Sequence, residues 1–254
     1  MILTPPESYL DQFESKSEKK RDVLRARYDA EIRFMDEQLG RLVKRLRKNG
    51  FWDKMIVVVV ADHGQGLGDH GWWSHGILFQ EQIRVPLLIR VPGMGRGNRV
   101  PSLVRTIDVM PTVLEAAGVD PSLWPPMDGS TLSGAMRTGR TAEPREAYAD
   151  SVNILSYGRP DDRRKQDHNS DKLYCLMTDR YKLIYHQLFP DQTQFFDIQE
   201  DPGEFKDLAH RNLPEMQEMM ERLDALDAYS NFKMGDEPTD PERVERLKQL
   251  GYGE

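Results

Sequence analysis

The sequence predicts an α/β fold: part of a doubly wound, mixed or parallel sheet covered by helices, then a small antiparallel sheet with one helix. Two observations predict the first part. A long amphipathic helix stops at Asn49-Gly50, and a continuous apolar strand, Met55–Val60, follows almost at once. A strand that is apolar on both faces is typical of a parallel sheet covered by helices. The third observation is a series of short strands after residue 145, spaced like hairpins.

The elements of the first half follow in the order of an α/β core. From about Glu18 to Lys48, apolar residues recur at spacings of three and four, which predicts one helix whose apolar stripe packs on a sheet. A second buried strand is expected at Val85–Val91. A second helix is expected at Val104–Ala117, with Gly118 as its stop.

The pattern changes in the second half. Residues 119–145 are rich in proline and glycine and predict a linker to a different layer. Four short strands are then expected at 147–152, 172–177, 181–186 and 195–198. A turn is expected at 201–204, and a helix that bears several methionines at 213–229. The polar stretch 158–171 predicts a surface loop. We therefore expect three parts: the α/β core over 1–141, a small α+β subdomain over 142–229 and a tail over 230–254.

Composition limits the classes of function. Of 254 residues, 30% are charged, and the net charge is −7, which argues against a general nucleic-acid-binding protein. The single cysteine, Cys175, excludes an internal disulfide and a zinc site of several cysteines. No apolar run has the length of a membrane span, and the N-terminus lacks a signal-peptide layout.

One stretch, VVVVADHGQGLGDHGWWSHG at residues 57–76, concentrates polar chemistry. It holds three of the six histidines in the chain: His63, His70 and His75. Because ligands bind beyond the carboxyl ends of strands in open parallel sheets, Asp62 and His63 stand where a carboxylate and an imidazole can reach one divalent cation. The glycines that follow allow the loop to close over a bound group. His70 and His75 can donate to an anion or transfer a proton, so the stretch predicts a metal or anion site.

Several motifs together resemble the C-terminal half of a sulfatase, in the alkaline-phosphatase superfamily. They are Asp62-His63-Gly64, Gly68-Asp69-His70-Gly71, His75, Val85-Pro86-Leu87, Asp108-Val109-Met110-Pro111-Thr112, Thr178-Asp179-Arg180-Tyr181-Lys182 and Asp201-Pro202-Gly203-Glu204. The resemblance spans roughly residues 20–225. It implies an enzyme that hydrolyses a sulfate ester, either of a sugar or of an aryl alcohol. It also implies one divalent metal ion as the cofactor.

The resemblance also implies roles for the loop residues. Asp62 and His63 would be metal ligands, with calcium the usual ion in sulfatases. An imidazole ligand is more natural for manganese or zinc, so the identity of the metal stays open. His75 would bind the sulfate and act in catalysis, at a place where many sulfatases carry a lysine. His70 would either contact the leaving group or brace the loop.

The sequence also departs from the family pattern. Sulfatases use a formylglycine made from a Cys or Ser in a Cys/Ser-x-Pro-x-Arg motif, and Cys175 stands in Cys-Leu-Met-Thr-Asp instead. The early Asp-Asp metal pair of the family is absent as well. We therefore expect a C-terminal fragment that is inactive alone and needs a missing N-terminal half or a complementing chain. A half sheet would leave an apolar face uncovered, so we also expect poor solubility or association. With only two of the usual ligands, we expect the chain to bind metal weakly.

Two other functions remain open. One is hydrolysis of phosphonate or phosphate monoesters, a chemistry of the same superfamily. The other is a non-catalytic remnant that binds an anion or a protein. The compartment also stays open. Sulfatases are often exported, which makes a periplasmic or secreted full-length protein the expectation from the resemblance.

Overall fold

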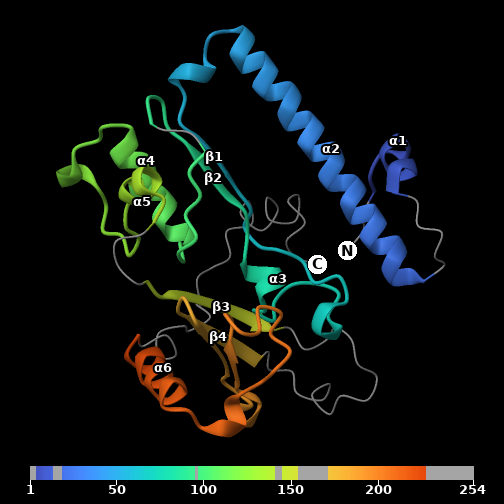
Figure 1. Cartoon of the computed structure of the whole chain (residues 1–254), viewed down its shortest axis with the longest axis vertical. Coiled ribbons are helices and arrows are strands. Elements are labelled where there is room, and N and C mark those ends of the chain that lie inside the picture. Colours follow the sequence, from blue (N-terminus) through green and yellow to red (C-terminus); the bar gives the residue numbers. More distant parts are fainter. Residues whose placement is uncertain (1–3, 14–18, 95–96, 141–144, 154–170, 227–254) are drawn as a thin grey trace, which may run out of the picture. The chain divides into compact units, whose positions relative to one another are not determined.

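A computed structural model describes residues 4–13, 19–94, 97–140, 145–153 and 171–226 of the chain (Figure 1). Two compact units can be distinguished, residues Met1–Leu213 and Pro214–Glu254. Most of the predicted loop 158–171 and the predicted tail 230–254 lie outside the described residues. No helix among the described residues is long and apolar enough to cross a membrane.

The long helix α2 spans Lys20–Lys48, close to the predicted bounds, and Gly50 follows its end at φ +70° (Figure 1). It lies against the short helix α1, Glu7–Leu10, and against two 3-10 turns, Asp11–Phe13 before it and Trp52–Lys54 after it. The predicted packing of its apolar stripe on a sheet is wrong for the second half of the helix. Met35 and Leu42 are more than half exposed there. A ribbon of two short strands has too little apolar surface to cover a helix of 29 residues.

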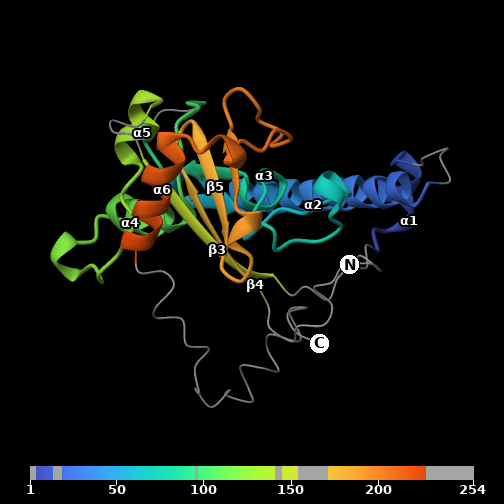
Figure 2. The ribbon, with the colours of Figure 1, turned by 90° about the horizontal axis from the view of Figure 1, so that it is seen from below.

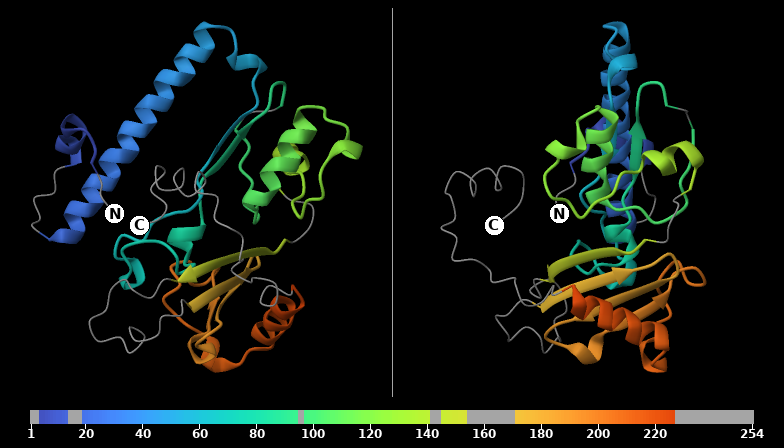
Figure 3. Two further views of the ribbon diagram at one scale, coloured as in Figure 1. Left: turned by 180° about the vertical axis from the view of Figure 1, so that it is seen from behind. Right: turned by 90° about the vertical axis from the view of Figure 1, so that its left-hand side faces the viewer.

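The first two strands form a narrow ribbon (Figure 3). β1, Val57–Val60, pairs antiparallel with β2, Leu87–Arg90, so the predicted parallel arrangement of these strands is wrong. Burial on both faces is wrong as well, because Val60 is 43% and Leu88 is 60% exposed. The chain between the strands turns back through a loop and one helical turn, α3 (Gln80–Ile83), and so reverses direction. A run of valines indicates a strand but says nothing about the direction of its partner.

Three short α-helices follow the ribbon along the chain. The predicted helix at 104–117 begins later, as a 3-10 turn at Thr106–Asp108 that leads into α4, Val109–Ala116. Asp108 accepts a hydrogen bond from the backbone N–H of Arg105 and so fixes this start. α5, Ser133–Thr138, falls in the predicted linker. α6, Pro214–Ala225, belongs to the second unit and carries the predicted apolar stripe.

The second sheet is the predicted antiparallel one. Its four strands follow the order β3-β4-β5-β6, and each begins and ends within one residue of the prediction: Ala147–Asn153, Asp171–Met177, Tyr181–His186 and Gln194–Asp197. Figure 2 shows β3, β4 and β5 beside one another. One face of the sheet carries a core cluster that includes Cys175 and Ile184, and the buried side chains of Leu78 and Phe79 pack onto it. The segment that follows the histidine loop is therefore part of this core.

Cys175 gives a direct test of this core. Its side chain is almost fully buried, and burial raises the pKa of the thiol to about 11. A thiol that is both buried and protonated reacts slowly with disulfide reagents, since the thiolate is the nucleophile. We expect 5,5′-dithiobis(2-nitrobenzoate) to label Cys175 in unfolded protein but not in native protein. Rapid labelling of the native chain would contradict this burial.

Candidate metal and anion site

The loop after β1 is closed by backbone hydrogen bonds. The N–H groups of Gly64 and Gln65 donate to the carbonyls of Gln82 and Glu81, at 2.7 and 3.0 Å. Gly64 fits because it has no side chain: a Cβ there would lie 2.1 Å from the carbonyl oxygen of Glu81. Gly68 takes a left-handed conformation, φ +92°, at a turn where its N–H donates to Trp72 O. The glycines thus hold the loop close to the chain around α3.

Asp62 and His63 lie side by side at the start of the loop. His63 Nδ1 lies 2.7 Å from its neighbour's carbonyl oxygen, Gly64 O. A carbonyl only accepts, so this hydrogen bond places a proton on Nδ1. The other ring nitrogen, Nε2, lies 3.9 Å from Asp62 Oδ2. The side chain of Asp62 is 66% exposed and that of His63 is 37% exposed, so solvent can reach both.

His75 lies against His63. The ring centroids are 4.1 Å apart and the ring planes are tilted by 31°. His75 Nδ1 lies 3.4 Å from Gln65 Oε1, which orients the ring from its other side. Partial burial, followed by the nearby charge of His63, lowers the pKa of His75. The structure therefore brings the predicted site residues Asp62, His63 and His75 together.

His70 belongs to a different cluster. Its Nδ1 lies 3.0 Å from Glu81 Oε1, and its Nε2 lies 3.1 Å from the carbonyl oxygen of Gly203. The ring stacks on Phe79 with the centroids 3.8 Å apart, and its side chain is only 13% exposed. These contacts join the histidine loop to the turn after β6.

The two predicted metal ligands are an incomplete set. Among the described residues, no group of three or more His, Cys, Asp or Glu side chains is placed to hold a metal ion. Divalent cations in proteins take four to eight ligands, so further ligands would have to come from elsewhere. Asp62 and His63 fit the donor chemistry of such a site as two of its members.

Some residues around the site were not predicted from the sequence. Gln65 holds His75, and Arg25 of α2 forms an ion pair with Asp69 of the loop at 3.1 Å. Glu81 and Glu204 hold His70 through a carboxylate and a backbone carbonyl. The turn at 201–204 was visible in the sequence, but its contact with a loop more than a hundred residues earlier was not.

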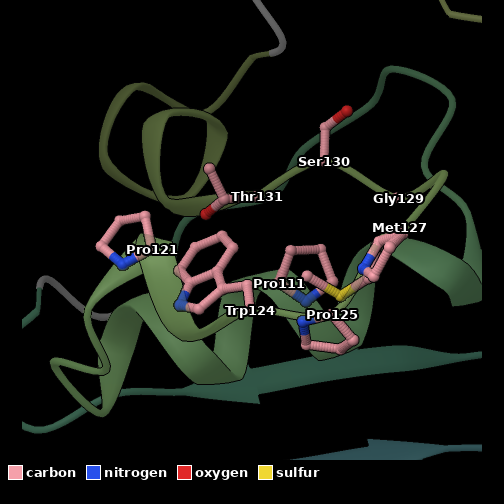
Figure 4. Close-up of a pocket in the computed structure, with 9 residues that line it drawn as sticks. Pro111, Pro121, Trp124, Pro125, Met127, Gly129, Ser130 and Thr131 are labelled. Carbon is pink, nitrogen blue, oxygen red and sulfur yellow. The ribbon is translucent and has the colours of Figure 1, made fainter.

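A separate pocket of about 430 Å³ lies around Trp124 (Figure 4). Its lining comes from residues 111–131 and is rich in proline, with Ser130 and Thr131 as the hydroxyl-bearing members. None of the lining residues belongs to the histidine loop. The described pocket and the candidate site are therefore different places.

Comparison with known proteins identifies the family. The model of the Sulfatase family matches residues 3–119, and the model described as N-sulphoglucosamine sulphohydrolase, C-terminal, matches residues 68–229, more than half of the chain. The chain belongs to the sulfatase family. Both matches include the end of the histidine loop, and the second also includes the antiparallel sheet.

Individual sulfatases and related hydrolases agree with this. The N-acetylglucosamine-6-O-sulfatase of Bacteroides thetaiotaomicron is 31% identical over 185 residues, which are 71% of this chain and 31% of the relative. BT4656, solved in complex with its substrate D-glucosamine-2-N,6-O-disulfate, gives a TM-score of 0.65 at 28% identity over 87% of this chain and 44% of that one. A phosphonate monoester hydrolase of Agrobacterium radiobacter gives a TM-score of 0.66 at 25% identity, over 82% of this chain and 42% of that one.

These comparisons confirm the predicted alkaline-phosphatase-like α/β class. They also show how much of a sulfatase the chain represents. It spans about a third of the length of the curated relatives it matches, from 31% to 36%.

Proposed function

We propose that this chain supplies part of the divalent-metal and sulfate-binding site of a sulfuric ester hydrolase. The observation that carries the proposal is the pair Asp62 and His63 at the end of β1, with the tilted ring of His75 against that of His63, the centroids 4.1 Å apart. A carboxylate and two imidazoles at one accessible place suit a cation and an anion bound together. Membership of the sulfatase family supports sulfate as that anion.

Asp62 and His63 would hold the metal ion. Because Nδ1 of His63 is engaged by the carbonyl of Gly64, its Nε2, on the side of Asp62, is the ring nitrogen that would bind the ion. We propose calcium as the ion, since the carboxylate suits it, with manganese or zinc as the alternatives that the imidazole favours. A bound cation would supply positive charge for the oxygens of the sulfate.

His75 would bind the sulfate and act in catalysis. Its ring is oriented by Gln65 and His63, so one nitrogen stays available to a sulfate oxygen. The lowered pKa of His75 favours the neutral ring near pH 7, which can donate one hydrogen bond or accept one proton. His70 would brace the loop, since both of its ring nitrogens are engaged.

The remaining part of the site would come from an N-terminal half or a complementing chain. Apolar side chains exposed on α2 and on the ribbon support this: Ile32, Met35, Leu39, Leu42, Val59, Val60 and Leu88. Such a surface in a sulfatase fits the rest of the α/β core, which buries its strands on both faces. We therefore expect no ester hydrolysis by this chain alone, and turnover only when that half is present.

Metal binding by the chain gives the first test. We expect calorimetric titration with Ca²⁺, Mn²⁺ and Zn²⁺ to show weak binding of at least one ion. Asp62→Asn and His63→Gln should each weaken binding about tenfold or more. His210→Gln, on an exposed helical turn, is the matched control and should bind as the wild type does. Equal binding by all four proteins would contradict the assignment and favour a non-catalytic remnant.

Phosphonate or phosphate monoester hydrolysis is the second candidate. The likeness to a solved phosphonate monoester hydrolase supports it, as does the Asp-His pair at the strand end. The completed enzyme should be assayed with 4-nitrophenyl sulfate and 4-nitrophenyl phenylphosphonate, each at several concentrations. A kcat/KM that is higher for the sulfate supports the first proposal, and the reverse order supports the second.

A further inference from the structure

A buried ion pair lies between the antiparallel sheet and the histidine loop. Lys182 of β5 and Glu204 of the turn after β6 have fully buried side chains, and Nζ lies 2.5 Å from Oε1. Lys182 stands on the core face of its strand, beside Phe196 of β6 and near the ring of Phe79. Buried charges are costly unless they are paired, so each residue fixes the position of the other.

Glu204 also holds the chain that closes the loop. Its second oxygen, Oε2, accepts a hydrogen bond from the N–H of Gln80 at 2.7 Å, where α3 begins. Its backbone carbonyl lies 3.2 Å from Nε2 of His70. One residue of the turn is therefore bound to the sheet, to α3 and to the histidine loop at once.

His70 completes this connection. Its ring stacks on those of Phe79 and Phe205, Nδ1 faces Glu81, and Nε2 faces the turn. Both His70 and Glu204 have positive φ angles, 50° and 56°. That region is disfavoured for residues other than glycine, so side-chain contacts must hold these two backbones in place.

A continuous set of contacts leads from this cluster to the candidate site. The carbonyl of Glu81 accepts from the N–H of Gln65 at 3.0 Å. The side chain of Gln65 in turn reaches Nδ1 of His75, whose ring lies against that of His63. Glu81 thus belongs both to the cluster and to the backbone pairing that shapes the loop.

We infer that Lys182, Glu204, His70 and Glu81, here named the anchor cluster, are positioning residues that hold His75 against His63. The inference rests on the proposed function in taking this histidine pair as the site. The anchor cluster does its work through Gln65 and the closed loop and does not contact a reacting atom. Its loss should release the loop while the antiparallel sheet stays folded.

The test uses the full chain and reads geometry, so it is independent of turnover. With their centroids only 4.1 Å apart, the rings of His63 and His75 give each other's protons ring-current shifts, which NMR detects after assignment by single His→Gln variants. His70→Asn suits the left-handed backbone but is too short to bridge Glu81 and Gly203. We expect the two shifts to collapse toward that of exposed His210. The amides of Gly64 and Gln65 should exchange about tenfold faster, as expected for one lost charge-assisted hydrogen bond.

Glu81→Ala provides a second variant, because it removes the carboxylate but leaves the carbonyl that holds Gln65. Glu200→Ala, an exposed glutamate near the same turn, is the matched control and should change nothing. Altered histidine shifts with unchanged methyl signals of Leu173 and Ile184 would support the inference. Unchanged histidine shifts in both variants would overturn it, and so would loss of the sheet signals in both. The histidine shifts can be measured even if the protein binds no metal and hydrolyses no ester, so failure of the proposed function would not decide this inference.

Discussion

Gly64→Ala is expected to destabilise the folded chain by about 3 kcal/mol or more. The added Cβ would lie 2.1 Å from the carbonyl oxygen of Glu81 and 3.0 Å from its carbonyl carbon. Both are backbone atoms, which cannot move aside as the end of a flexible side chain can. Relief would require breaking the pairing of Gly64 with Gln82 and of Gln65 with Glu81. The measurement is urea unfolding, followed through circular dichroism and the histidine ring signals.

Gly40→Ala is the matched control for this variant. Gly40 lies in α2, on an exposed surface, and a Cβ there would meet nothing within 4 Å. Alanine loses less conformational entropy in a helix, so this change should stabilise the chain by about 0.5–1 kcal/mol. If both variants unfold at the same urea concentration as the wild type, the loop does not approach Glu81 as closely as described.

The parts of the fold that sequence predicts well depend on local patterns. The four strands of the antiparallel sheet alternate with turns over short distances, and their bounds were predicted within one residue. The end of α2 at Asn49 and Gly50 is equally local, because a glycine with positive φ ends a helix by itself.

The direction of a strand is not a local property. The valines of β1 indicated a strand buried on both faces, whereas the structure has an exposed antiparallel ribbon. The apolar residues of β1 and α2 suit a larger sheet than the described residues form. Their apolar pattern is typical of residues buried on both faces of a sheet, and the described residues do not bury them in that way.

The candidate site was predictable where its residues share one loop. Asp62, His63 and His75 lie within fourteen positions, so a single turn of the chain brings them together. The role of His70 stayed open because its partners Gly203 and Glu204 lie more than a hundred residues away. Contacts of that kind arise from tertiary packing, and no spacing in the sequence indicates them.

Asp108→Asn is expected to cost about 3–5 kcal/mol, because it breaks a buried charge cluster. The carboxylate is fully buried and accepts from Arg105, Arg145 and the N–H of Ser130, each at 2.9 Å. An amide would turn an NH2 group, which only donates, toward donors that one carboxylate oxygen now serves, and would leave two arginines without their counter-charge. The effect should appear in urea unfolding at pH 7, with the start of α4 as the first region to lose protection from hydrogen exchange.

The pH dependence of this cost separates charge from packing. Burial alone would raise the pKa of Asp108, but hydrogen bonds from Arg105 and Ser130 outweigh it and hold that pKa below its usual value. A depressed folded pKa gives stability that is present above the unfolded value of about 4 and lost as the pH falls through the folded value. The difference in free energy of unfolding between wild type and Asp108→Asn should therefore shrink in acid.

Asp120→Asn is the control. The exposed side chain of Asp120 accepts a hydrogen bond from the N–H of Ser122, and asparagine caps equally well, so this variant should stay within about 0.5 kcal/mol of wild type at pH 7. A cost for Asp108→Asn that stays constant down to pH 3 would show that shape, and not the carboxylate charge, holds the two arginines.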